Sequence, residues 1–246
     1  MINILILRFR KLIFSIIHRK MWRALTYGVF PSLEHTNILS YLNKQSNIDF
    51  ICDVGANKGQ FSLATSYSLP KIKTVAFEPL LDENKIFKKI FKNNNLYTIV
   101  PKALGSQNKR IKINLTKKLH SSSILKPAKE LADTFGQSSN KKTTANMVTL
   151  YDYFKNKNLH FKNGLLKIDV QGYELEVLKG SKEIINKFKY IIIELSNIEL
   201  YINQPLAMEV IKFIEKNSYE LSCTYNKFIN KNNELVQADY LFKRIF

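Results

Sequence analysis

The sequence has few cysteines, few arginines and no long apolar run. Its 246 residues include only Cys52 and Cys223, which lie far apart and form no metal-ligand spacing. We therefore expect no disulfide framework and no metal site, and two reduced thiols are typical of a cytoplasmic protein. No segment approaches the roughly 18 apolar residues of a membrane-spanning helix. Hydrophobic residues make up 45% of the chain, which suits one α/β domain rather than two.

The charge of the chain is strongly positive, with a formal net value of +18. Such a charge can indicate a nucleic-acid partner or an anionic membrane. Lysine greatly outnumbers arginine, however, and no arginine-rich or aromatic-interleaved stretch typical of nucleic-acid modules is present. The pattern favours lysines spread over solvated faces, and we expect no specific nucleic-acid partner.

Residues 1–23 differ from the rest, because they hold four of the six arginines. One side of a helix over this segment would carry Ile2, Leu5, Ile6, Phe9, Leu12, Ile13, Ile16 and Ile17. The other side would carry Lys11, Ser15, His18 and Arg19. A basic amphipathic helix can lie on anionic lipid, and it can equally pack on the domain or pair with a second subunit. No small-residue cleavage site follows, so a signal peptide is not indicated. We predict an N-terminal helical extension over residues 1–47 and one domain over 48–246.

A glycine turn organises that domain. The apolar run 50–54 ends in a turn that carries Gly55 and Gly59, and a helical pattern follows over 60–67. Strand, glycine turn and helix begin a nucleotide-binding βαβ unit. We expect Gly55 to adopt a backbone conformation that a Cβ disfavours, and Gly59 to let the helix pack close to the strand. Asn57 stands where the dinucleotide fingerprint needs glycine, and no Lys-Ser/Thr pair follows to make a P-loop.

Acidic residues end several apolar strands. Asp53, Asp169 and Glu194 each lie at such an end, and Glu78 follows the apolar run 74–77. A doubly wound fold places an acid on ribose hydroxyls about 20 residues after the first strand, close to the position of Glu78. An acid-lined edge suits a cationic cofactor and an acceptor that releases a proton.

The remaining pattern alternates strands and helices, as in a doubly wound, mostly parallel α/β sheet. Further strands are predicted over 97–100, 111–115, 143–149, 165–169, 190–193, 219–222 and 237–243. The strand over 111–115 is expected to form a hairpin. A helix over 174–180 should end at Gly180. Residues 119–140 are the least regular part and are hypothesised to cover the acceptor. His120 in this part is a candidate base, although a lone histidine in a polar loop is more often merely solvated.

Three motifs together resemble a known family. They are Asp-Val-Gly-Ala-Asn-Lys-Gly at 53–59, Ala-Phe-Glu-Pro at 76–79 and Leu-Lys-Ile-Asp-Val-Gln-Gly-Tyr-Glu-Leu at 166–175. They closely resemble the FkbM family of methyltransferases over about residues 49–195, and the Lys-Ile-Asp-x-x-Gly-x-Glu block is the most specific signature. The resemblance implies S-adenosylmethionine as cofactor. It also implies a seven-stranded Rossmann-like methyltransferase sheet with helices on both faces.

The resemblance also implies roles for individual residues. The methionine part of the cofactor would be held by Asp53, Gly55, Ala56, Asn57 and Gly59. The ribose would lie at Glu78 and Pro79, and the adenine near Ala103 and Leu104. The reaction edge would carry Lys167, Asp169 and Glu174, with Asp169 also beside the cofactor.

The catalytic base is left open between two carboxylates. The family usually has glutamate where this chain has Gln171, so the base role passes to Asp169 or Glu174. We propose Asp169 as base, oriented by Lys167 and Glu174, because a hydroxyl acceptor must lose a proton. The alternative is that Lys167 and Glu174 form a buried structural ion pair.

The family transfers methyl groups to hydroxyl oxygens of sugars and polyketide-like molecules. The predicted function is therefore a cytoplasmic O-methyltransferase acting on a sugar, glycan or glycolipid precursor, with peripheral contact to the inner membrane face through residues 1–23. An RNA methyltransferase is the second hypothesis, although no RNA-binding module or Asn/Asp-Pro-Pro-aromatic motif is present. A non-catalytic, membrane-associated binding protein is the third. A homo-oligomer is left open.

Overall fold

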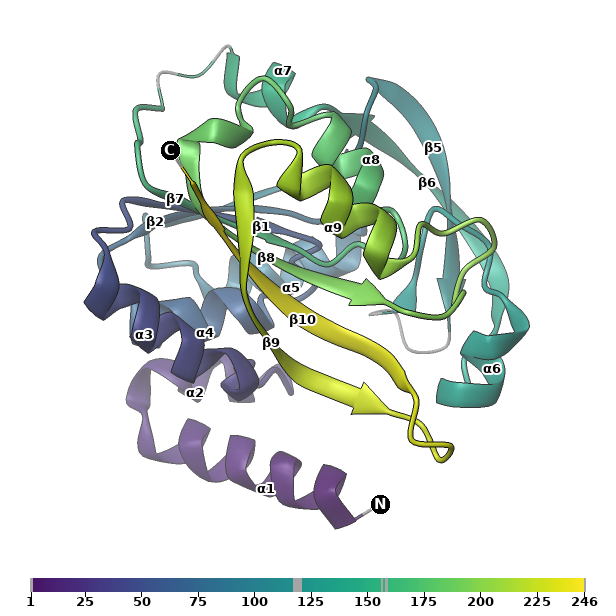
Figure 1. The fold of residues 1–246 in the computed structure, drawn as a ribbon. Helices are drawn as coiled ribbons and strands as arrows, with labels where there is room; N and C mark the ends of the chain where they lie inside the picture. Colours follow the sequence, from purple (N-terminus) through teal and green to yellow (C-terminus); the bar gives the residue numbers. More distant parts are fainter. Residues whose placement is uncertain (1, 117–120, 156, 158, 246) are drawn as a thin grey trace.

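The protein folds into three layers around a seven-stranded sheet (Figure 1). A computed structural model describes residues 2–116, 121–155, 157 and 159–245. The sheet has the strand order β3-β2-β1-β7-β8-β10-β9. Its strands are β1 Phe50–Val54, β2 Lys73–Phe77, β3 Tyr97–Val100, β7 Gly164–Ile168, β8 Phe188–Ser196, β9 Tyr219–Ile229 and β10 Leu235–Arg244. The predicted seven-stranded, mostly parallel, doubly wound sheet is confirmed.

The order of the strands reverses between β1 and β7. β1 pairs in parallel with β2 on one side and with β7 on the other, whereas β10 runs antiparallel to β8 and β9. The register sets Asp53 directly opposite Lys167. Ligands of open α/β sheets bind at such a switch point, outside the carboxyl ends of the strands.

Helices cover both faces of the sheet. One face carries α3 Thr36–Gln45, α4 Gln60–Ser68 and α5 Leu81–Ile90, and the other carries α7 Leu150–Lys155, α8 Glu174–Lys179 and α9 Ala207–Glu215. Alternate residues of β8 point to opposite faces: Ile191 and Ile193 pack with α9, and Ile192 packs with α3. Because both faces are buried, the central strands read as continuous apolar runs.

A second, three-stranded sheet lies beside the first, in the order β4-β6-β5. Its strands are β4 Ala103–Leu104, β5 Lys109–Thr116 and β6 Ser139–Val148. The strand predicted over 111–115 does pair antiparallel, but with a partner across a long connection rather than in a short hairpin. That connection contains α6 Lys129–Phe135, so the irregular part is shorter than predicted. His120 lies outside the described residues.

The glycines show where local patterns were misread. Gly55 has φ +79°, as predicted, and Gly59 has φ +94°. A Cβ on Gly59 would meet Phe87 of α5 at 2.8 Å, so this glycine makes room for a neighbouring helix rather than for the strand. Gly180 ends α8, as predicted, but with a right-handed φ of −73°. A Cβ there would lie 2.0 Å from the Gly105 carbonyl oxygen, so close backbone approach explains this glycine.

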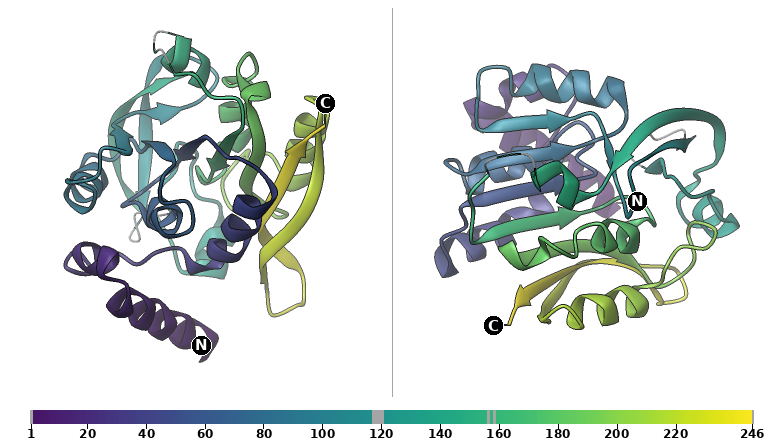
Figure 2. Two further views of the ribbon diagram at one scale, coloured as in Figure 1. Left: turned by 90° about the vertical axis from the view of Figure 1, so that its left-hand side faces the viewer. Right: turned by 90° about the horizontal axis from the view of Figure 1, so that it is seen from above.

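The N-terminal segment lies against the edge of the domain. It comprises α1 Ile2–Ile17 and α2 Trp22–Leu25, and α1 lies outside the three layers (Figure 2). Ser15 is fully buried, and Phe14 packs on the core cluster that contains Met21. Within the part of the chain that the structure describes, no helix is long and apolar enough to cross a membrane.

Candidate functional site

A cavity of about 400 Å³ opens at the carboxyl ends of β1, β2, β7 and β8. This volume lies in the range of small-molecule sites. One side of the cavity is lined by Val54, Gly55, Ala56, Asn57, Gln60, Phe77, Glu78, Pro79, Leu80, Ala103 and Leu104, and we call it the cofactor side. The other side is lined by Lys11, Glu34, His35, Lys167, Asp169, Gln171, Glu194, Asn226 and Asp239, and we call it the acceptor side.

The glycine turn forms the floor of the cofactor side. The amides of Gly55 and Ala56 both donate to the Phe77 carbonyl oxygen at 3.0 Å, which ties the turn to the end of β2. A Cβ on Gly55 would lie 1.7 Å from the Asp169 carbonyl oxygen, so no other residue fits between β1 and β7 here. Asn57 has φ +49°, a left-handed conformation that asparagine tolerates.

Glu78 follows the neighbouring strand β2 and contacts the glycine turn after β1. Its carboxylate accepts hydrogen bonds from the amides of Asn57 and Leu80, both at 2.9 Å. Burial raises the pKa of Glu78 to about 7. A carboxylate oxygen offers more than one acceptor position, so Glu78 can also take ribose hydroxyls. The prediction for Glu78 and Pro79 is compatible with this geometry, since both line the cavity.

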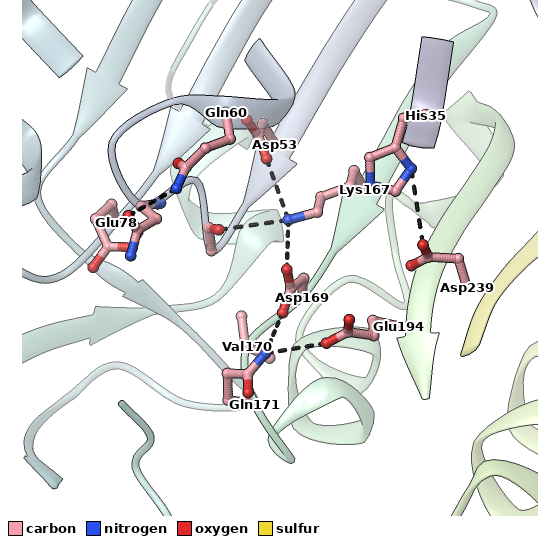
Figure 3. A network of polar contacts seen from close by, with 12 residues as sticks. His35, Asp53, Gln60, Glu78, Lys167, Asp169, Val170, Gln171, Glu194 and Asp239 are labelled. Atoms are coloured by element: carbon pink, nitrogen blue, oxygen red, sulfur yellow. Dashed lines mark hydrogen bonds and ion pairs between the residues drawn. The ribbon is translucent and has the colours of Figure 1, made fainter. Parts of the chain in front are cut away.

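Lys167 is the central cation of the site (Figure 3). Its ammonium lies 3.1 Å from Asp169 and 3.8 Å from Asp53, and it approaches the Gly55 carbonyl oxygen at 3.5 Å. Burial alone would lower the pKa of Lys167, but the two carboxylates outweigh it and hold that pKa above its usual value. The cation thus ties the ends of β1 and β7 together.

Of the two carboxylates paired with Lys167, Asp169 is the one that lines the cavity. Its side chain is 31% exposed, and Lys167 lowers its pKa against the opposing effect of burial. The Gln171 amide donates to Asp169 at 2.6 Å and to Glu194 at 3.1 Å. Burial raises the pKa of Glu194. The loop therefore fixes an ionised carboxylate at the cavity wall.

Gln171 is itself fixed by contacts from distant parts of the chain. The Tyr201 hydroxyl donates to its side-chain oxygen at 2.9 Å, and the Ser123 hydroxyl donates to its carbonyl oxygen at 2.6 Å. Its backbone is left-handed, with φ +60°. A non-glycine residue holds this conformation only where its surroundings determine it.

Three predicted site residues lie behind the cavity wall. Asp53 is fully buried and accepts a hydrogen bond from the Ser62 hydroxyl at 2.7 Å. Glu174 accepts from the amides of Val170 and Gly172, both at 3.1 Å, and burial raises its pKa to about 7. Neither carboxylate lines the cavity, and nor does Gly59. Their placement supports the loops that carry Gly55 and Asp169.

The alternative interpretation, a buried ion pair between Lys167 and Glu174, is not found among the described residues. The described ion pairs of Lys167 are with Asp53 and Asp169. Glu174 instead caps its own loop through backbone amides.

Several acceptor-side residues were not predicted as site residues. His35 precedes α3, and its Nδ1 lies 3.0 Å from the Tyr225 hydroxyl and 3.9 Å from Asp239. Asn226 donates to Asp239 at 2.8 Å, and it lies where the β9–β10 register shifts. A bulge re-aims a side chain in this way. The sequence signal that could have indicated this part of the site is Asp239, an acid within the mostly apolar stretch 236–242.

The contact between His35 and Asp239 is not an ion pair at neutral pH. Burial, aided by the charge of Lys167, lowers the pKa of His35 to about 4. Burial raises the pKa of Asp239 to about 7. The neutral imidazole of His35 and the carboxyl group of Asp239, which is near its pKa, can each donate or accept a hydrogen bond at this wall.

The cofactor side fits S-adenosylmethionine. The recess at Gly55 excludes any Cβ, and the Gln60 side-chain oxygen is buried without a hydrogen-bond partner among the described residues. Ala103 and Leu104 give an apolar wall for a base, and Glu78 an acceptor for hydroxyls. When bound, this cofactor supplies an electrophilic methyl group on a positively charged sulfur. Among the described residues, no group of three or more His, Cys, Asp or Glu side chains could hold a metal ion.

Comparison with solved structures finds methyltransferases of low sequence identity. They include magnesium protoporphyrin IX methyltransferase of Synechocystis PCC 6803 with bound cofactor (10% identity, TM-score 0.48, covering 87% of this chain and 81% of that chain). TrmK of M. capricolum with S-adenosylhomocysteine gives 12% identity and a TM-score of 0.46, covering 85% and 67%. The ribosomal protein L11 methylase of Lactobacillus delbrueckii gives 10% and 0.46, covering 89% and 83%. These similarities carry no argument about the substrate.

Comparison with known families gives a direct match. No curated protein matches the chain. The model of the methyltransferase FkbM domain matches residues 53–221, from the end of β1 into β9. The match begins slightly later than the predicted 49–195 and continues beyond its C-terminal end. This match spans more than half of the chain and includes the glycine turn, Glu78 and the Lys167–Glu174 block; the chain belongs to the FkbM methyltransferase family, and its methyl donor is S-adenosylmethionine.

Proposed function

We propose that the protein is an O-methyltransferase that acts on a hydroxyl of a sugar, glycan or glycolipid precursor. The observation that carries the proposal is the ionised Asp169 carboxylate at the cavity wall, held by Lys167 at 3.1 Å and by Gln171 at 2.6 Å. A fixed carboxylate of this kind accepts the hydrogen bond of an incoming hydroxyl and so orients its oxygen.

The chemistry requires two things of the protein. The acceptor oxygen must be held in line with the methyl group, and such positioning supplies about 7–11 kcal/mol of the barrier. The hydroxyl proton must also find an acceptor, and a positioned base contributes roughly 10²–10⁴-fold. Asp169 meets both requirements, because it is oriented from two sides and kept ionised by its neighbour Lys167.

The composition of the acceptor side supports a polyhydroxylic substrate. His35, Asn226 and Asp239 present donors and acceptors from three separate elements, as a sugar ring with several hydroxyls requires. A strong, salt-dependent gel shift with RNA would instead support the RNA hypothesis.

The first test removes the charge at Asp169. In an Asp169→Asn variant we expect S-adenosylmethionine affinity by calorimetry to stay within a few-fold of wild type. Methyl transfer to glycan should fall by roughly 10²–10⁴-fold. The matched control is Asp133→Asn on the exposed side of α6, which should keep full activity. Turnover of Asp169→Asn at the wild-type rate would refute the base role.

The second test identifies the acceptor. Surface glycans from cells with and without the protein are compared by mass spectrometry, and we expect the loss of one methyl group from one species. Identical methylation in both samples would contradict a glycan acceptor.

A further inference from the structure

The outward face of α1 is apolar and uncovered. The exposed apolar side chains described on this face are Ile6, Phe9, Leu12, Ile13, Ile16 and Ile17. Phe9 is 62% exposed and Ile17 is 69% exposed, which is unusual for side chains of this size on one helix. Trp22 is exposed beside them, with its indole nitrogen donating to the Ile16 carbonyl oxygen at 2.7 Å. The predicted apolar side is therefore turned away from the domain.

Arginines border this face on both sides. At about 100° per residue, Arg8 and Arg10 lie on opposite flanks of Phe9. Both are exposed, as are Arg19 and Arg23 just beyond the helix. None of these four forms an ion pair among the described residues. An apolar stripe between free cations is the pattern of a helix that lies in the plane of an anionic bilayer.

The opposite face of α1 reaches the acceptor side of the cavity. Lys11 pairs with Glu34 at 2.8 Å, and both residues line the cavity. Glu34 directly precedes His35 in the short helix Leu33–His35. Figures 1 and 2 show α1 at the edge of the molecule, so its outer face is accessible while its inner face serves the site. One helix thus connects a surface with the place where the acceptor binds.

The charges distinguish between the possible occupants of the outer face. A second copy of the chain in a two-fold contact would bring the arginines of one α1 against those of the other. An anionic lipid surface would neutralise them, and apolar side chains such as Phe9 and Ile16 would enter the boundary between headgroups and acyl chains.

We propose that the outer face of α1 docks on an anionic bilayer, and that this holds the acceptor side of the cavity at the lipid surface. The acceptor is then a hydroxyl of a lipid-linked glycan. This last step rests on the proposed function, whereas the docking itself does not.

Vesicle flotation of the full chain tests the docking. Wild type should float with vesicles of 70% phosphatidylcholine and 30% phosphatidylglycerol, and at least tenfold less with pure phosphatidylcholine. Phe9→Glu/Ile16→Glu should reduce the fraction bound to anionic vesicles at least tenfold. The matched control, Met208→Glu/Leu221→Glu, alters exposed apolar residues of α9 and β9 and should bind like wild type. Thermal unfolding and S-adenosylmethionine binding are measured for each variant to check that it is folded.

Two results would overturn the docking. One is equal flotation of wild type and Phe9→Glu/Ile16→Glu. The other is a wild-type dimer in ultracentrifugation that does not float and that this variant abolishes, which would assign the face to a second copy.

Methyl label tests the substrate class separately. Membrane lipids from the source cells are reconstituted into the anionic vesicles and incubated with the protein and tritiated S-adenosylmethionine. We expect label in the organic phase, and at least tenfold less with Phe9→Glu/Ile16→Glu. Label only in water-soluble glycans would overturn the lipid-linked acceptor. Flotation and cofactor binding with no transfer to either phase would contradict the proposed function and leave the docking standing.

Discussion

The two sides of the cavity are built in different ways. The cofactor side comes mainly from residues 54–60 and 77–80, short stretches that follow two neighbouring parallel strands. The acceptor side gathers residues from Lys11 to Asp239, almost the full length of the chain. The first is held by backbone amides, as at Gly55 and Glu78, and the second by side chains, as at His35 and Gln171.

This difference explains what each side can change. A turn held by backbone hydrogen bonds tolerates few substitutions, because a Cβ or a different φ alone disrupts it. A wall of side chains from separate elements can be altered one residue at a time. We therefore expect acceptor specificity to reside in the side chains, and cofactor binding in the backbone. The predictions below separate the two.

The largest effect is expected at Lys167, where the two sides meet. Lys167→Met leaves the buried carboxylate of Asp53 without its cation, and loss of one partner of such a pair costs about 3–5 kcal/mol. Urea denaturation should show this loss, with both cofactor binding and turnover impaired. Adding Asp53→Asn should recover part of it. Exposed Lys216→Met is the control, and an equal effect there would contradict the pairing.

The next effect is expected at Gly55, in the floor of the cofactor side. Gly55→Ala forces a clash with the Asp169 carbonyl, and overpacking costs about 1–3 kcal/mol. The left-handed backbone adds about 1–2 kcal/mol. Calorimetry should show at least a hundredfold loss of S-adenosylmethionine affinity. Gly136→Ala has a similar φ of +64° but no neighbour within 4 Å, so only the backbone penalty should remain. An equal loss of unfolding free energy in Gly55→Ala and Gly136→Ala would disprove the steric argument.

A smaller effect on the acceptor side should sharpen the comparison. His35→Gln removes the imidazole that contacts Tyr225 and faces Asp239. We expect the KM for the glycan acceptor to rise about tenfold, equivalent to about 1.4 kcal/mol. The Kd for S-adenosylmethionine should stay within twofold. His160→Gln, at an exposed position, is the control. A weaker cofactor affinity with an unchanged KM for the acceptor would contradict the assignment of His35 to the acceptor side.

A pH-dependent effect is expected at Glu78 in the cofactor-free protein. Burial raises its pKa from 4.5 to about 7, so between these values the folded state keeps a proton that the unfolded state loses. The contribution of this group to the unfolding free energy is present below pH 4.5 and falls by about 1.4 kcal/mol per pH unit up to pH 7. Glu78→Gln cannot titrate. The unfolding free energy of wild type should therefore fall relative to that of Glu78→Gln from pH 5 to pH 7, and a constant difference would sink the argument.

The sequence predicted the sheet and most of the cofactor side. Apolar runs fixed the strands, since strands buried on both faces need them, and the glycine turn after Val54 placed the ligand. Glu78 followed from its offset along the chain. These features depend on neighbours within about 25 residues, where local patterns are informative.

Other assignments need the folded chain. Gly59 and Gly180 were recognised as special, but the helix and the carbonyl that require them lie elsewhere in the sequence. Glu174 was assigned to the reaction edge from the motif, while the structure places its carboxylate on backbone amides behind the wall. A motif records that a residue is needed and not which atoms it touches.

By itself, the sequence determined where most strands lie, the glycine floor and the amphipathic character of residues 2–17, because these follow from periodicity and from covalent geometry. Only the tertiary structure decided that Lys167 lies between Asp53 and Asp169, that His35 and Asn226 join Asp239, and that α1 turns its apolar face outward. The reason is physical: Lys167 meets Asp53 and His35 meets Asp239 across more than a hundred residues, the position of Asn226 depends on a bulge, and the position of α1 depends on which side of a helix is buried. No local pattern encodes these.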